Sequence, residues 1–245
     1  MKREAITPCG EHTAAVSGSG RSVGRREAVA PGSAWALVTG AGSGIGRCYA
    51  LRLAALGYRL VIVGNNAAPL EAVAGEIRRA AGANASASFP EVRVMPMDLA
   101  RVGAAQELHD RTAAEGIEID VVINNAGIFS FCDILTTPAE RIERIILLHD
   151  LTVTQLCRLF AADMVRRGVR GHILNMSSYS LWMPFPGLAL YSASKAYMRS
   201  FSVAFAKEVR ERGIRVTALC PAGVATDLYG LTPYWQRIGR KLGVL

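Results

Sequence analysis

Tyr191 and Lys195, four positions apart, are the residues of this 245-residue chain whose types and spacing point most directly to chemistry. They open a stretch that is predicted to be helical, and this spacing places both side chains on one helix face. An ammonium beside a phenol favours the phenolate and lowers a tyrosine pKa from its usual value of about 10. A tyrosine so placed can give and take a proton near neutral pH, as general acid–base catalysis requires.

A serine upstream supplies a second candidate group. Ser178 follows the short apolar run that ends at Met176, and a hydroxyl at a strand end can hydrogen-bond a substrate carbonyl oxygen. A Tyr-x-x-x-Lys spacing is common by chance in helices, so it indicates little alone. Ser178, Tyr191 and Lys195 together predict proton transfer to or from a carbonyl or hydroxyl group.

A glycine-rich loop lies between the first apolar run and the first predicted helix. It reads Thr39-Gly40-Ala41-Gly42-Ser43-Gly44-Ile45-Gly46. Glycines let backbone N–H groups approach a ligand closely, and the N-terminus of the following helix attracts an anion. The spacing is neither G-x-G-x-x-G nor a P-loop, because no Gly-Lys-Ser/Thr follows. The loop predicts a pyrophosphate site, and the alternative is a turn that binds no ligand.

The end of the second predicted strand bears on which dinucleotide fits. Sheets of this kind often carry an acid there for the ribose hydroxyls, but the sequence reads Gly64-Asn65-Asn66. No carboxylate stands there to repel a 2′-phosphate. Arg47, in the first helical turn, is either within reach of such a phosphate or an ordinary exposed helix residue. We therefore expect NADP or NAD as cofactor, with NADP favoured and Asn65 in contact with it.

The elements that must position these groups alternate along the chain. Short apolar runs predict strands over Trp35–Thr39, Arg59–Val63, Val92–Met97, Asp120–Asn124, His172–Met176 and Ile214–Cys220. Helical patterns fill 45–56, 68–81, 101–115, 138–167 and 191–212. Continuous apolar strands separated by helices indicate an α/β fold, a single doubly wound Rossmann-type parallel sheet with helices on both faces. Ligands bind such sheets at the carboxyl ends of the strands, where all the candidate residues fall.

Composition narrows the remaining classes. The content of 51% hydrophobic and 20% charged residues excludes a chain that is disordered throughout. The count of 5 cysteines in 245 residues excludes a disulfide scaffold. No C-x-x-C pair or histidine-rich segment predicts a metal site, and no apolar run is long enough for a membrane span. The net charge of +8 comes from scattered arginines, so a nucleic-acid partner is not expected. Residues 1–33 predict a disordered extension without a secretory signal, and residues 34–245 predict one domain. We expect the protein to be located in the cytoplasm.

Over about residues 34–230 the chain resembles the short-chain dehydrogenase/reductase family. The resemblance rests on the glycine loop, Asp98, Leu99, Asn125, Ala126, Gly127, Ser178, Tyr191, Lys195 and the stretch 221–226. It implies that Tyr191 is the proton donor in carbonyl reduction, that Lys195 also holds the nicotinamide ribose, and that Ser178 orients the carbonyl. It implies further cofactor contacts from Asp98 and Leu99 at adenine, from Asn125, Ala126 and Gly127 along the groove, and from Pro221, Val224 and Thr226 at the nicotinamide. A homodimer or homotetramer through 138–167 and 191–212 is the usual family assembly.

Three features depart from the family pattern. His149 stands where a proton-relay asparagine is often found, so it is a candidate relay residue or a packing histidine. Pro221-Ala222-Gly223 replaces the usual Pro-Gly. The chain ends at Leu245 with no sequence that predicts the family's seventh strand, although 228–242 predicts one helix. The sheet is therefore expected to lack that strand, either because the open reading frame continues or because a partner subunit covers the edge.

The segments around the site contain aromatic and apolar residues. They read Phe129-Ser130-Phe131, then Leu181-Trp182-Met183-Pro184-Phe185-Pro186, then Leu228-Tyr229. Such a lining favours a lipophilic ketone or secondary alcohol, such as a steroid, a 3-oxoacyl chain or an aryl ketone, although ordinary packing would look the same. We expect an NAD(P)-dependent oxidoreductase acting on such a small molecule. The alternative is a non-catalytic dinucleotide-binding module that senses cofactor or scaffolds a partner.

Overall fold

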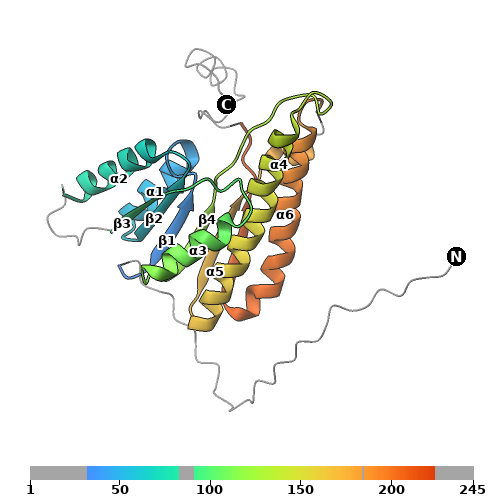
Figure 1. Ribbon diagram of the computed structural model, residues 1–245. Coiled ribbons are helices and arrows are strands. Elements are labelled where there is room, and N and C mark those ends of the chain that lie inside the picture. Colours follow the sequence, from blue (N-terminus) through green and yellow to red (C-terminus); the bar gives the residue numbers. More distant parts are fainter. Residues whose placement is uncertain (1–31, 83–90, 184, 224–245) are drawn as a thin grey trace.

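Six parallel strands form one sheet in the computed structural model, which describes residues 32–82, 91–183 and 185–223 (Figure 1). The sheet order is β3-β2-β1-β4-β5-β6. The strands are β1 (Trp35–Thr39), β2 (Arg59–Gly64), β3 (Val92–Pro96), β4 (Ile119–Asn124), β5 (Gly171–Met176) and β6 (Ile214–Leu219). This order places the chain reversal between β1 and β4, where a doubly wound sheet opens a crevice for ligand.

The central strands are buried on both faces, which explains their continuous apolar sequence. Every residue of β1 and β4 is buried, and Leu37 pairs with Val61 on one side and with Val122 on the other. One core cluster around Leu37 and Phe160 lies between the sheet and the later helices, and a second around Ile62 lies beneath the first two helices. These central strands are the rigid part of the domain on which the site is built.

Helices cover both faces of the sheet. α1 (Gly44–Ala55) and α2 (Ala67–Gly82) lie on one face, and α3 (Ala104–Ala114), α4 (Ala139–Ile146), α5 (Val153–Arg167) and α6 (Ala189–Val209) lie on the other (Figure 1). Short helical turns η1 (Leu147–Thr152), η2 (Tyr179–Trp182) and η3 (Arg210–Arg212) complete the described elements. The predicted doubly wound Rossmann-type sheet is therefore confirmed, with strand boundaries within a residue of those expected from the sequence.

The long helix predicted over 138–167 is not one regular helix. A π-helical stretch, η1, joins α4 to α5 and contains the neighbouring residues His149 and Asp150. A π-turn inserts one extra residue and is frequent at functional sites, because it re-aims the side chains that follow it. By length and composition Ala139–Arg167 is apolar enough to cross a membrane, but half of its most apolar window is buried inside the fold, so this is weak evidence for a span.

Several predictions concern parts of the chain outside the described residues. These are most of the N-terminal extension over residues 1–33, the helix over 228–242, and the cofactor contacts of Val224 and Thr226. Within the described part, β6 is an edge strand of the six-stranded sheet, and no seventh strand accompanies it.

Candidate active site

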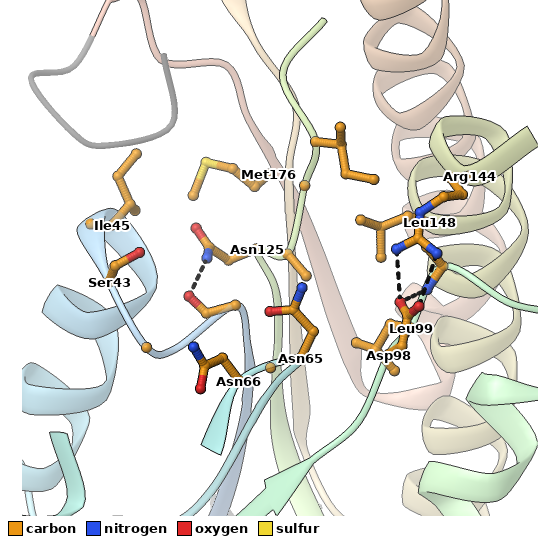
Figure 2. Close-up of a pocket in the computed structure, with 18 of the residues that line it drawn as sticks. Ser43, Ile45, Asn65, Asn66, Asp98, Leu99, Asn125, Arg144, Leu148 and Met176 are labelled. Carbon is orange, nitrogen blue, oxygen red and sulfur yellow. Dashed lines mark hydrogen bonds and ion pairs between the residues drawn. The ribbon is translucent and has the colours of Figure 1, made fainter. Parts of the chain in front are cut away.

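A cavity of about 370 Å³ opens at the carboxyl ends of the strands, across the crevice between β1 and β4 (Figure 2). Most of the residues predicted from the sequence line it: Gly40, Ser43, Gly44, Ile45, Asn65, Asp98, Leu99, Asn125, Ala126, Gly127, Ser178, Tyr191, Lys195 and Pro221. The glycine loop and the Tyr–Lys pair, which are about 150 positions apart in sequence, therefore share one cavity. Its volume falls in the range of small-molecule sites, roughly 300–1,000 Å³.

The glycine loop owes its shape to backbone conformations and contacts that a side chain would not tolerate. Gly40 and Gly44 have φ of +64° and +52°. A Cβ on Gly46 would lie 2.1 Å from the Gly40 carbonyl oxygen, so Gly46 lets α1 pack directly beneath the loop. Gly46 is buried and does not line the cavity; it positions the loop from below. Ser43 precedes α1 in extended conformation, and its side chain makes no capping hydrogen bond to the first-turn N–H groups of α1.

Asn125 pins the glycine loop to the end of β4. Its Nδ2 donates to the Thr39 carbonyl at 3.0 Å and to the Gly40 carbonyl at 3.2 Å. The Thr39 hydroxyl in turn accepts the N–H groups of Asn125 and Ala126, each at 3.0 Å. Figure 2 shows Asn125 reaching back to the loop. These bonds fix the two walls of the crevice relative to each other.

The residues at the end of β2 agree with the sequence prediction, and Arg47 takes one of its two alternatives. Asn65 and Asn66 line the cavity, and Asn66 also accepts the Ala68 N–H at 3.1 Å at the start of α2. Arg47 instead makes a two-point ion pair with Glu76 of α2 and is absent from the cavity lining. Of the two alternatives for Arg47, the structure shows the partly exposed helix residue, because an acid on the neighbouring helix holds its side chain.

Tyr191 lies in the first turn of α6, and its side chain is buried at 6% exposure while still reaching the cavity. Its ring contacts Phe129 edge-on at 5.1 Å between centroids, which shields one side of the phenol from water. Ser178 lines the same cavity at the start of η2, where its Oγ accepts the Ser180 N–H at 3.2 Å. An oxygen that accepts from the backbone keeps its own O–H available as a donor.

Lys195 is the buried cation of the site. It is 3% exposed, and its Nζ donates to the Met176 carbonyl at 2.9 Å and lies 5.6 Å from the centroid of the Tyr191 ring. Burial lowers the pKa of Lys195 to about 8, against the opposing influence of Asp150. The ammonium is therefore charged at neutral pH but titrates much closer to it than an exposed lysine. Among the described residues the bond to Met176 is the hydrogen bond that Nζ makes, so two of its three N–H donors are left for a ligand.

His149 is fully buried, and both of its ring nitrogens are bonded to protein groups. Nε2 accepts the Ile128 N–H at 2.9 Å, so Nδ1 carries the proton and lies 2.9 Å from the Ser194 Oγ. Burial, reinforced by the charge of Lys195, lowers the pKa of His149 well below its usual value of 6.5. A neutral ring with no open nitrogen does not pass protons to water. The packing interpretation is therefore the one that the geometry favours, and His149 does not line the cavity.

Asp150, the next residue, was not singled out by the sequence motifs. It is half-buried in η1, and its Oδ1 is buried without a hydrogen-bond partner among the described residues. Burial raises its pKa to about 6, although attraction to the Lys195 ammonium pulls it down. Asp150 is thus an acid electrostatically coupled to the buried lysine, placed by the extra residue of the π-turn.

Other residues line the cavity as well. Gly42, Gly64, Asn66 and Ala222 stand within motifs that the sequence already marks. No local motif marks the rest, which are Pro69, Leu70, Met97, Ala100, Ile128, Arg144, Leu148, Met176 and Ser177. Most contribute backbone or apolar surface, which suits the flat rings of a dinucleotide. Among the described residues there is no group of three or more histidine, cysteine or acidic side chains that could hold a metal ion.

The glycine loop gives a direct test of whether a dinucleotide fits this cavity. Gly40, Gly42 and Gly44 line it with bare backbone, and α1 begins at the loop without an acid in its first turn. A glycine-rich turn ahead of a helix N-terminus is the arrangement that accepts a pyrophosphate. The residues present therefore fit a nicotinamide dinucleotide.

Comparison with known proteins decides the family. The sequence profile of the family described as short chain dehydrogenase matches residues 34–236. The chain belongs to the short-chain dehydrogenase/reductase family. This confirms the resemblance carried by the glycine loop and the Tyr–Lys pair.

The similar curated proteins are longer than this short-chain dehydrogenase. It is 36% identical over 210 residues to a very-long-chain 3-oxoacyl-CoA reductase of Anas platyrhynchos, covering 83% of the chain and 64% of the relative. It is 35% identical over 197 residues to the probable oxidoreductase EphD of Mycobacterium tuberculosis, covering 80% of the chain but 32% of that protein. It is 33% identical over 199 residues to mouse 17-beta-hydroxysteroid dehydrogenase type 3, with coverage of 79% and 61%. The chain thus spans less than two thirds of each of these relatives.

Solved structures of the family share the fold. A short-chain dehydrogenase from Sphingobium yanoikuyae in complex with NADPH superposes with a TM-score of 0.73 at 32% identity, covering 80% of this chain and 73% of that one. A bulky-bulky ketone specific alcohol dehydrogenase from Comamonas testosteroni gives 0.71 at 30% identity, covering 79% and 76%. These two solved structures, one of them in complex with NADPH, therefore share the fold of this chain.

Proposed function

We propose that this protein transfers a hydride between a nicotinamide dinucleotide and a lipophilic ketone or secondary alcohol, with Tyr191 as the proton donor and acceptor. The observation that carries the proposal is the shared cavity. Within it the pinned glycine loop before α1, the Ser178 hydroxyl at η2, and the Tyr191 phenol and buried Lys195 ammonium of α6 come together from three separate parts of the chain. The bound nicotinamide would supply or accept the hydride, and the chain would supply placement and the proton.

Each catalytic group has a role that follows from its surroundings. Ser178 offers its O–H to the substrate oxygen, because its own Oγ is steadied by the Ser180 N–H. Tyr191 holds the proton at its phenol oxygen, giving it up in carbonyl reduction and taking it in alcohol oxidation. Lys195 keeps a positive charge against the Tyr191 ring while Met176 fixes its direction, so the ionised phenol is stabilised as the proton leaves.

We favour NADP over NAD as the preferred cofactor. The support is what lies at the end of β2: Asn65 and Asn66 line the cavity where an NAD-selective sheet often places a carboxylate. Amide groups can donate to a 2′-phosphate without repelling it. Arg47 no longer contributes to this argument, since it is held by Glu76.

The proposed substrate is bulky and apolar. Phe131 and Phe185 stack at 6.2 Å between centroids and are 60% and 56% exposed, and Tyr179 packs against Trp182 at 5.4 Å. These rings come from the segments after β4 and β5, which flank the catalytic residues. The names of the similar proteins, an oxoacyl-CoA reductase and a bulky-ketone alcohol dehydrogenase, support a large lipophilic carbonyl compound.

We also infer that the protein is a homo-oligomer. α6 carries a column of stacked aromatic rings, formed by Tyr197, Phe201 and Phe205. Two exposed apolar residues accompany them, Leu151 in η1, just before α5, and Val203 on α6. Exposed apolar surface on two long helices is typical of a subunit interface. The cytoplasmic location expected from the sequence stays a prediction.

The proposal is tested with purified protein, NADH and NADPH, and a panel of ketones. Cofactor binding is measured by fluorescence titration, and turnover by loss of the reduced nicotinamide absorbance. Tyr191→Phe should lower turnover by at least about 100-fold, because one positioned proton transfer is lost, while the cofactor Kd stays within about twofold. Tyr58→Phe, far from the cavity, is the matched control and should behave as wild type.

Two outcomes would contradict the proposal. If Tyr191→Phe keeps more than about a tenth of wild-type turnover, Tyr191 is not the proton donor. If the wild type binds NADPH or NADH but reduces none of the ketones, a non-catalytic dinucleotide-binding module becomes the better description.

A further inference from the structure

An arginine that no sequence motif marks contacts the segment just after β3, at one side of the cavity. Arg144, in the last turn of α4, donates from Nη1 to the Asp98 Oδ2 at 3.0 Å and from Nη2 to the Asp98 Oδ1 at 3.4 Å. Both side chains line the cavity, and each is about two-fifths exposed, at 38% and 39%. Figure 2 shows the pair beside Leu99 and Leu148, on the far side of the cavity from Ser43 and Ile45.

The environment of Asp98 makes its carboxylate both ionised and fixed in direction. Burial alone would raise the pKa of Asp98. Three groups together outweigh burial and lower this pKa: the Ala100 N–H, which donates to Oδ1 at 2.9 Å, the Arg144 guanidinium, and the charge of Arg101. The printed bonds occupy three of the roughly four lone-pair sites of the carboxylate. The remaining site belongs to Oδ2, which accepts only from Arg144 among the described residues.

An ionised carboxylate only accepts hydrogen bonds, so this end of the cavity distinguishes donors from acceptors. A purine with an exocyclic amine offers a donor, whereas one with an exocyclic carbonyl offers an acceptor and would place two oxygens against each other. An arginine suits the holding role better than a lysine, because its planar fork binds both carboxylate oxygens and fixes the plane of the group.

We propose that Arg144 is a positioning and specificity residue of the adenine end: by holding Asp98 as an oriented anion it makes the site select a 6-amino purine over a 6-oxo purine. The inference rests on the proposed function, since it assumes a dinucleotide whose adenine lies at this end. Arg144 acts through Asp98 and not on the reacting atoms, so its effect belongs to cofactor binding.

The experiment compares two reduced cofactors that differ only at this purine position. NADH and its deaminated analogue, reduced nicotinamide hypoxanthine dinucleotide, are titrated by fluorescence into wild type, Arg144→Met and Arg158→Met. Wild type should bind NADH about tenfold or more tightly than the analogue, as expected for a hydrogen bond to a charged acceptor. Arg144→Met should weaken NADH binding by about tenfold and the analogue by less than about twofold, so the preference collapses. Arg158, exposed on α5, is the matched control and should keep it.

A merely structural role for Arg144 predicts a different result. It would weaken both cofactors alike and leave their ratio unchanged, and that outcome would overturn the inference. So would a wild type that binds both cofactors equally. Failure to bind either NADH or NADPH at all would instead reject the proposed function itself.

Two further variants keep the test decisive if Arg144→Met folds poorly. Arg144→Lys keeps the charge without the fork and should retain only part of the preference. Asp98→Asn replaces the anion with an amide that both donates and accepts, and it should bind the analogue about as well as NADH. A preference that survives both substitutions would show that the purine is read elsewhere.

Discussion

The Nδ1 atom of His149 lies 2.9 Å from the Oγ of Ser194, and this contact ties the crevice to the catalytic helix. On its other side His149 accepts the backbone N–H of Ile128, and Ser194 donates onward to the Tyr191 carbonyl at 2.8 Å. The chain of bonds therefore runs from the segment after β4, through η1, to the first turn of α6. It sets where Tyr191 stands relative to Gly127 and the cofactor groove.

His149→Leu should remove this link while nearly preserving the side-chain volume. The half-buried Ile128 N–H would then lose its partner, at a cost of about 1 kcal/mol in the free energy of unfolding. Urea denaturation would measure that loss, and kcat should fall more than cofactor affinity because Tyr191 is the group displaced. Since His149 is neutral at working pH, the shape of the pH–rate profile should stay the same. A profile that loses an ionisation in the variant would revive the relay interpretation of His149.

Gly46→Ala should disrupt cofactor binding from beneath the loop. Its new methyl group would lie 2.1 Å from the Gly40 carbonyl oxygen, and backbone must move to relieve that overlap. We expect about 1–3 kcal/mol of destabilisation and at least a tenfold rise in the cofactor Kd, because the displaced loop no longer matches a pyrophosphate.

Gly75→Ala is the matched control for that experiment. Gly75 lies inside α2, and a methyl group there meets only the flexible end of Arg79 at 3.4 Å. Alanine should stabilise that helix by up to about 1 kcal/mol and leave the cofactor Kd unchanged. If both glycine variants bind cofactor equally well, the loop geometry is not what holds the ligand.

Much of this site could be predicted from the sequence, because its main parts are encoded locally. Apolar runs bounded by turn residues fixed the strand ends to within a residue, and parallel strands necessarily gather those ends at one edge. The glycine loop and the Tyr191–Lys195 spacing each occupy a few consecutive residues, so their geometry follows from one turn of backbone.

The parts that could not be predicted depend on contacts between distant segments or on an irregular turn. Arg144 and Asp98 are 46 positions apart, and in the sequence Arg144 is indistinguishable from any exposed helix arginine. The sequence left Arg47 as either a 2′-phosphate contact or an exposed helix residue, because nothing in its neighbourhood reveals Glu76 on the next helix. The π-turn had no sequence signature, so the pattern gave no means of placing Asp150 near the buried lysine.

Val203→Glu tests the proposed oligomer. Val203 is 45% exposed on α6, so a glutamate there should leave the fold intact, but a charge buried in a subunit interface is costly. Light scattering after size exclusion should show the mass shifting from a dimer or tetramer to a monomer. Ala72→Glu adds the same charge on α2, on the opposite face of the sheet, and should leave the mass unchanged. A wild type that already runs as a monomer, or a Val203→Glu variant that does not dissociate, would contradict the inference.

Asp150→Asn tests the charge coupling beneath the active site through pH. Lys195 has a pKa of about 8 and must be charged to stabilise the ionised phenol, so activity should fall as pH rises through about 8. Asp150 carries a negative charge above about pH 6 and raises the pKa of Lys195 by attraction, so removing that charge should lower the pKa further. The falling limb of kcat/KM should therefore move to lower pH in the variant.

The size and direction of that shift separate coupling from a general effect on the fold. Glu143→Gln removes one negative charge from the exposed side of α4 and should leave the limb where it is, since the charge lies in water. A lower kcat/KM at all pH values with an unmoved limb would mean that Asp150 only supports the π-turn. A limb that moves upward would contradict the coupling outright, because loss of an anion cannot make a neighbouring ammonium harder to deprotonate.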